Sequence, residues 1–99
     1  MLVRFMDSER LWYRAPELGD APRLQRLLND PRVRRTVTRA YPLTLEPEEE
    51  WVRSVAIGHG LQAPPAVSLV FGLRGESVLV GSTGLFGINW VSRQAEWGI

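Results

Sequence analysis

An alternation of apolar residues, interrupted by one short turn, constrains this fold more than any other feature of the sequence. From Val67 to Leu73, large apolar side chains occupy every second position, which predicts a β-strand. Arg74-Gly75-Glu76-Ser77 then forms a tight turn, and Val78 to Val80 begins a return strand. The sequence therefore predicts a β-hairpin.

The return strand is rich in glycine and leads into a further strand. Gly81, Gly84 and Gly87 lie within it, and glycines inside a strand are typical of a bulge or of close approach by another backbone. Residues Asn89 to Arg93 then turn the chain, and Gln94 to Ile99 is predicted as the last strand.

The first half of the sequence predicts one strand and two helices. Leu11 to Ala15 is short and aromatic and ends before a proline, which favours a strand. Asp20 is placed to cap one helix, and Thr44 to cap a second whose first turns hold Glu46 to Glu50, where negative charge complements the helix dipole. The predicted order is β-α-α-β-β-β, an α+β fold with an antiparallel sheet. Residues 1–99 are expected to form a single domain.

The composition excludes several classes of function. The 99 residues contain no cysteine and one histidine, His59, so zinc sites and cysteine chemistry are excluded. A formal net charge of +1 argues against nucleic-acid and membrane partners, which usually require a basic excess. No apolar run approaches the roughly 18 residues of a membrane span, and the charged start differs from a secretory signal. We therefore expect a cytoplasmic protein.

All four tryptophans are expected to contribute to the core. Their large apolar rings favour burial, and each indole N–H then needs a hydrogen-bond acceptor. The four residues are Trp12, Trp51, Trp90 and Trp97.

Two segments near the C-terminus carry a resemblance to a known family. Residues Val80 to Trp90 contain Gly81-Ser82-Thr83-Gly84-Leu85 and end in Ile88-Asn89-Trp90, and Arg93-Gln94-Ala95-Glu96-Trp97-Gly98-Ile99 follows. With the predicted element order, this stretch resembles the GCN5-related N-acetyltransferase (GNAT) superfamily. More narrowly, it is similar to the branch that acetylates ribosomal-protein N-termini and polyamines. One departure is Ile99, where the family often has tyrosine.

The resemblance implies that the chain is the N-terminal half of the GNAT fold. In the family, the fourth strand continues into a glycine-rich loop and a helix N-terminus whose backbone donors bind the pyrophosphate of acetyl-CoA. We expect that segment beyond Ile99, so the chain alone should neither bind acetyl-CoA nor catalyse transfer. The open edge of the strand Gln94 to Ile99 predicts a homo-oligomer, by strand pairing or domain swapping, or association with the missing C-terminal half.

Glu96 is the candidate catalytic residue that the resemblance implies. Acetyl transfer to an amine requires a neutral nucleophile, and a carboxylate on the fourth strand can act as its base, directly or through water. Alternation places Glu96 opposite Ala95 and Trp97. The alternative is a structural carboxylate that hydrogen-bonds a neighbouring arginine or backbone group.

Three further residues are candidates for binding the amine substrate. Asn89 and Trp90 begin a loop that lies near the site in the family, although a turn asparagine beside a packed tryptophan is the alternative. Tyr41, between the two helices, corresponds to the part that shapes substrate choice, or it covers the helix ends.

Two other functions remain open from the sequence. The chain can be a small non-catalytic interaction module that uses the half fold as a binding scaffold. It can also bind nucleic acid or an acidic substrate through the cluster Arg32, Arg34, Arg35 and Arg39, although the neighbouring glutamates favour a solvated face. His59, between two glycines, is read as a helix stop or surface residue.

Overall fold

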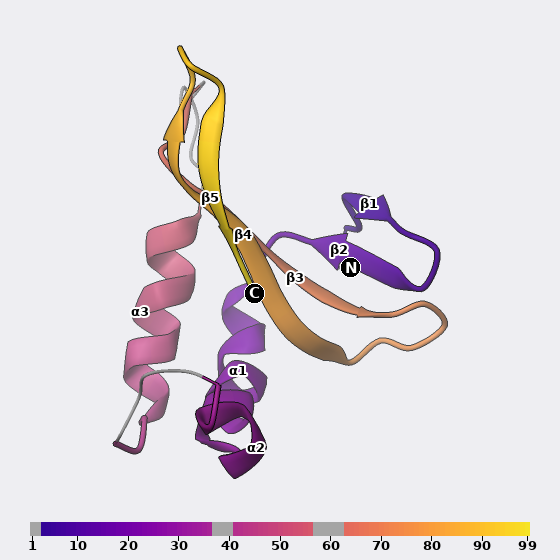
Figure 1. Cartoon of the computed structure of the whole chain (residues 1–99). Helices are drawn as coiled ribbons and strands as arrows, with labels where there is room; N and C mark the ends of the chain where they lie inside the picture. Colours follow the sequence, from indigo (N-terminus) through magenta and orange to yellow (C-terminus); the bar gives the residue numbers. More distant parts are fainter. Residues whose placement is uncertain (1–2, 37–40, 57–62) are drawn as a thin grey trace. The chain divides into compact units, whose positions relative to one another are not determined.

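The computed structural model describes residues 3–36, 41–56 and 63–99, which fall into two compact units (Figure 1). The sheet unit is Met1–Pro16 with Val55–Ile99, and the helical unit is Glu17–Ser54. Both His59 and Arg39 lie outside the described residues. The expectation of a single domain stays a prediction.

The sheet unit is a five-stranded antiparallel sheet whose strand order follows the sequence (Figure 1). Its strands are β1 (Met6–Asp7), β2 (Leu11–Arg14), β3 (Val67–Leu73), β4 (Leu79–Asn89) and β5 (Gln94–Gly98). The predicted hairpin is β3 and β4, and its turn places Gly75 at φ 92°, in the left-handed region that glycine tolerates. The α+β class and the antiparallel sheet are therefore confirmed.

The first strand, β1, is absent from the predicted order. It pairs with β2 through Met6 and Tyr13, and Phe5 N donates to Tyr13 O at 2.8 Å. A strand of two residues is too short to show alternation. The observed order therefore begins with two strands rather than the single strand that the sequence predicts.

The glycine-rich strand β4 carries the predicted bulges. Phe71 faces Gly81 but the next residue of β3 faces Leu79, so Val80 is an extra residue. A second shift follows Phe86, where Gly87 adopts φ 55°. A Cβ added at Gly84 would lie 2.6 Å from a backbone oxygen of β3, which confirms the close backbone approach.

The two faces of the sheet differ in burial. Side chains alternate between the faces along each strand, and the register aligns them across strands. The buried face, as named here, includes Trp12, Arg14, Ser68 and Val70. The other face, named here the outer face, includes Leu11, Tyr13, Val67, Leu69, Phe71, Leu73, Thr83, Leu85 and Trp97.

Trp12 is the largest side chain of the buried face, with 3% of its surface exposed. Its Nε1 donates to Glu76 O at 2.8 Å, which satisfies the indole N–H as expected. The guanidinium carbons of Arg14 and Arg4 lie 5.4 and 5.8 Å from the ring centroid, within cation–π range. The ring also lies directly against Gly72, so a side chain at that position would overlap it.

The helical unit contains a short 3₁₀ turn and three helices. They are η1 (Leu18–Asp20), α1 (Ala21–Asn29), α2 (Pro31–Arg34) and α3 (Leu45–Val55). The prediction that Asp20 caps α1 with its side chain is wrong: its carboxylate instead accepts from Glu17 N at 2.7 Å, upstream of η1. The start of α3 after Thr44 matches the prediction, and Glu48 of its first turn is buried.

The segment that precedes α3 is held to α1 by side-chain amides. Asn29 Nδ2 donates to Leu43 O at 2.9 Å, and Leu43 N donates to Asn29 Oδ1 at 2.9 Å. Gln25 Nε2 also donates to Leu43 O, at 3.0 Å. Because Leu43 is buried, these amides provide the partners that its backbone would otherwise lack.

Asp30 caps α2, and Arg32 of the arginine cluster pairs with it. Arg32 N donates to Asp30 Oδ1 at 2.8 Å, and the guanidinium contacts the same carboxylate at 2.9 Å. The side-chain hydrogen bond from Arg32, and then the backbone one, lower the pKa of Asp30 from 3.8 to about 2. Because the pKa of Asp30 is lower in the folded chain than its ordinary value of 3.8, the contacts of its ionised carboxylate stabilise α2 fully at pH values above 3.8. This stabilisation is lost as the pH falls through about 2.

An NMR titration of the Asp30 carboxyl carbon is expected to give a midpoint near 2. Arg32→Ala should move that midpoint part of the way towards 3.8, because the backbone donor remains. Arg34→Ala should leave it nearly unchanged, since Arg34 acts only as a more distant charge. A wild-type midpoint at 3.8 would contradict the pairing.

Candidate functional site

Asn89 organises the turn between β4 and β5. Its Oδ1 accepts from the backbone N–H groups of Val91 and Ser92, each at 3.1 Å. Arg93 N donates to Asn89 O at 2.8 Å, and Arg93 adopts φ 61°. These are the contacts of an Asx turn. In this structure, the side-chain oxygen of Asn89 therefore serves to form the turn.

Trp90 joins this turn to the segment before β3. Its Nε1 donates to Pro64 O at 2.8 Å, and Ile88 N donates to Pro65 O at 2.9 Å. The indole ring is nevertheless half exposed. Trp90 is therefore fixed by one hydrogen bond while its ring stays available to another molecule.

An open hollow of about 450 Å³ lies beside this turn, within the size range of small-molecule sites. Val67, Leu85 and Ala95 contribute its apolar part. Its other lining residues are Ile88, Asn89, Trp90, Arg93 and Gln94. The structure thus places the predicted Asn89 and Trp90 together in one concavity, which contains one arginine and no acidic side chain among the described residues.

Glu96 lies on the side of β5 opposite the hollow. It faces Phe86 in the register, whereas its neighbours Ala95 and Trp97 belong to the outer-face side, as alternation predicts. Its side chain is exposed, and within the described ranges its carboxylate has no hydrogen-bond or ion-pair partner. A purely structural role for Glu96 would require an arginine or a backbone group as hydrogen-bond partner, and the described contacts include none.

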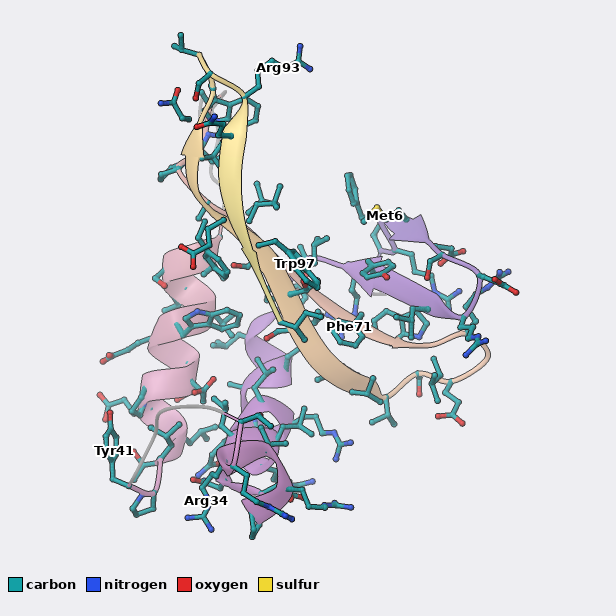
Figure 2. All side chains as sticks on the ribbon, viewed as in Figure 1. Met6, Arg34, Tyr41, Phe71, Arg93 and Trp97 are labelled. Atoms are coloured by element: carbon teal, nitrogen blue, oxygen red, sulfur yellow. The ribbon has the colours of Figure 1, made fainter. Side chains whose placement is uncertain are left out.

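Tyr41 lies in the helical unit, two residues before Leu43, and its side chain is exposed (Figure 2). The other three candidates lie in the sheet unit. The structure therefore brings together Asn89 and Trp90, while Tyr41 belongs to the other unit.

Trp97 departs most from its expected burial. Its ring is 66% exposed, and its Nε1 donates to Thr83 Oγ1 at 2.9 Å. Thr83 Oγ1 in turn donates to Gly98 O at 2.8 Å. Trp97 is thus anchored at its polar atom while its ring stands outside any core, so the prediction that every tryptophan is buried is wrong.

The described residues show no metal-binding cluster, and those of the sheet unit show no common diphosphate-binding element. No group of three or more His, Cys, Asp or Glu side chains gathers in the described ranges. Diphosphates are commonly held by backbone N–H groups at a helix N-terminus, but the described residues of the sheet unit begin no helix. The described residues of the sheet unit therefore offer a diphosphate no helix N-terminus. Among the described helices, none has the length and apolar character that crossing a bilayer requires.

Comparison with known proteins gives one family and two solved structures. A family model described as an acetyltransferase (GNAT) domain matches residues 10–99. A search of curated proteins found no significant match. A chimera of the spermidine N-acetyltransferase SpeG from Vibrio cholerae and hSSAT is 22% identical with a TM-score of 0.63, and the match covers 89% of this chain and 48% of that one. Apo FdhC, described as a nucleotide-linked sugar GNAT, is 15% identical with a TM-score of 0.72, and the match covers 97% and 53% of the two chains.

At these identities the two structures establish the fold alone. They match almost all of this chain, and the chain spans about half the length of each. The prediction that this α+β fold corresponds to about half of a GNAT chain is therefore confirmed.

Proposed function

The chain belongs to the acetyltransferase (GNAT) domain family, and from this we propose that it forms the acceptor-side part of an acetyl-CoA-dependent N-acetyltransferase. The acceptor is an amine of a protein N-terminus or of a small molecule. The observation that carries this proposal is the hollow beside the β4–β5 turn, since Asn89 and Trp90 both line it.

The composition of the hollow narrows the acceptor class. Its lining combines apolar side chains with Arg93, and an arginine disfavours a second cation nearby. An amine carried on an apolar body therefore suits the hollow better than a polyamine with several positive charges. Among the proposed acceptors, a peptide N-terminus is favoured.

Glu96 is proposed as the proton acceptor for this amine. An α-amino group has an ordinary pKa of about 7.7–8.0, so it is largely protonated at neutral pH and must lose a proton before it attacks. Since Glu96 lies on the other side of β5 from the hollow, direct contact with an amine inside the hollow is not available. The proton would therefore have to pass from the amine to Glu96 through water.

Acetyl-CoA binding is proposed to require residues that this chain does not contribute. The described strands offer no helix N-terminus for its diphosphate, and the solved relatives are about twice as long as the matched region. The 99-residue chain alone is then inactive. It becomes active with a polypeptide that supplies the other half of the fold.

An NMR titration tests the acceptor site directly. The probe is the tripeptide Ser-Ala-Leu with an amidated C-terminus, added to the ¹⁵N-labelled chain at pH 8, with spermidine added to a second sample. The peptide is expected to shift the Trp90 indole N–H and the amides of Gln94 and Ala95, at lower concentration than spermidine does. The side-chain amide of Asn29, in the helical unit, should not move.

Two variants make this test specific. Trp90→Ala should abolish the shifts at Gln94 and Ala95, whereas Val91→Ala, on the same turn but outside the hollow, should preserve them. Peptide-induced shifts that avoid this turn, or stronger binding of spermidine, would contradict the proposed site.

A second candidate function is a non-catalytic interaction module, which the apolar outer face of the sheet favours. The same titration separates the two functions, because a module without an acceptor site would show no amine-dependent shift at Trp90.

A further inference from the structure

The hollow beside the β4–β5 turn is lined by two residues whose side-chain donors have no acceptor in the described part of the chain. Asn89 Oδ1 accepts from Val91 N and Ser92 N, which fixes the orientation of the side-chain amide. Its Nδ2 then points away from those N–H groups, and no described residue accepts from it. The guanidinium of Arg93 likewise has no hydrogen-bond or ion-pair partner within the described ranges.

The turn brings these two residues to the same end of the hollow. Arg93 N donates to Asn89 O at 2.8 Å, and Asn89 is the register partner of Gln94, the residue after Arg93. Figure 2 shows Arg93 at the tip of the β4–β5 hairpin. The donors of Asn89 and Arg93 therefore belong to one polar part of the lining, distinct from the apolar part that Val67 and Leu85 contribute.

Arg93 has a backbone conformation that a glycine would adopt more easily. Its φ of 61° lies in the left-handed region, and within the described ranges no other residue except glycines does so. A glycine or an asparagine at this position would form the turn at lower cost, and strained residues are typical of ligand sites. The turn itself therefore does not require an arginine, whose guanidinium stays available to a ligand.

The chemistry of these groups determines which ligand fits. Neither a side-chain amide nitrogen nor a guanidinium accepts a hydrogen bond, and no acidic side chain is among the described residues that line the hollow. A carboxylate is an acceptor only, and it pairs with a guanidinium through two parallel hydrogen bonds. The apolar side chains of the hollow reduce the water around such a pair and so strengthen it.

We propose that Asn89 Nδ2 and the Arg93 guanidinium bind a carboxylate that the acceptor carries near its amine. This inference rests on the proposed function, because it takes the hollow as the acceptor site. It narrows the acceptor to amines with an acidic group close by, such as a peptide whose second residue is glutamate. A free acidic amino acid has the same two groups, and the experiment distinguishes these two sources.

An NMR titration with two matched peptides tests this contact. The probes are Ser-Glu-Leu and Ser-Gln-Leu, both with an amidated C-terminus, added to the ¹⁵N-labelled chain at pH 8. Both should shift the Trp90 indole N–H. The glutamate peptide should bind about 10-fold more tightly, because it alone places an anion at these donors. Added salt should reduce this preference.

Three variants, each of which lowers the net charge of the chain by one, make the test specific. Arg93→Gly suits the left-handed conformation, and Asn89→Asp keeps side-chain oxygens that accept from Val91 N and Ser92 N. Both variants should reduce the preference for the glutamate peptide to less than about 2-fold. Arg53→Gln, at an exposed residue of α3, is the matched control and should preserve it.

The outcomes separate this inference from the proposed function. Equal affinities for the two peptides, with the Trp90 shift retained, would overturn the carboxylate contact and leave the hollow as the acceptor site. No shift at Trp90 with any probe would overturn both. A preference that survives Arg93→Gly and Asn89→Asp would overturn the assignment of these residues. Tighter binding of free glutamate than of the peptide would support the contact with an amino acid as the acceptor.

Discussion

Gly72→Ala is expected to destabilise the chain by about 3 kcal/mol. A Cβ at this position would overlap the Trp12 ring and would lie 2.7 Å from the backbone oxygen of Val78. Neither neighbour can move easily, because Trp12 is buried and hydrogen-bonded to Glu76 O. Since small domains are stable by only about 5–15 kcal/mol, urea unfolding should show a large decrease in the transition midpoint.

Two other glycines provide a graded comparison. At Gly81 the three atoms nearest to an added Cβ all belong to the Phe71 ring, the first at 2.6 Å. This ring lies on the partly exposed outer face, so Gly81→Ala should cost less than Gly72→Ala. At Gly19 nothing lies within 4 Å, so Gly19→Ala should change stability by less than about 0.5 kcal/mol. Equal midpoints for the three variants would refute the steric account.

Asn29→Leu is the second variant with a large expected effect, a loss of about 2–3 kcal/mol. Leucine resembles asparagine in size, but it removes the donor and the acceptor that Asn29 presents to Leu43. The N–H of buried Leu43 would then lack its partner, and its C=O would keep only the bond from Gln25. Unfolding in urea, followed by circular dichroism, measures the loss.

Asn29→Asp separates the two hydrogen bonds. Aspartate still accepts from Leu43 N, but it cannot donate to Leu43 O, so its cost should lie between those of wild type and Asn29→Leu. Gln25→Ala removes a single bond to the same carbonyl and should cost about 1 kcal/mol. If Asn29→Asp were as unstable as Asn29→Leu, the hydrogen bond from Leu43 N to the side chain at position 29 would contribute nothing to stability.

The strands of the sheet could be predicted because their signals are local. Alternation located β3, glycines located the bulges of β4, and the turn residues Asn89 to Arg93 separated β4 from β5. The exposure of Trp97 could not be predicted in this way. Alternation tells which residues share a face, but it does not tell whether that face has a cover.

The candidate site shows the same division between local and long-range information. Asn89 and Trp90 are adjacent in sequence, so a turn brings them together without tertiary information. Val67 and Leu85 line the hollow with them only because of the register of three strands. No single segment of the sequence determines that register. Tyr41 belongs to the other unit, and its relation to the hollow rests on the family resemblance alone.

Calorimetric titration of the 99-residue chain with acetyl-CoA tests the central claim most directly, namely that this chain supplies the acceptor side of the site and not the coenzyme side. The account predicts no saturable heat for a dissociation constant below about 1 mM. The peptide titration on the same sample provides the check that the chain is folded. One-to-one binding of acetyl-CoA with a micromolar dissociation constant would contradict the account.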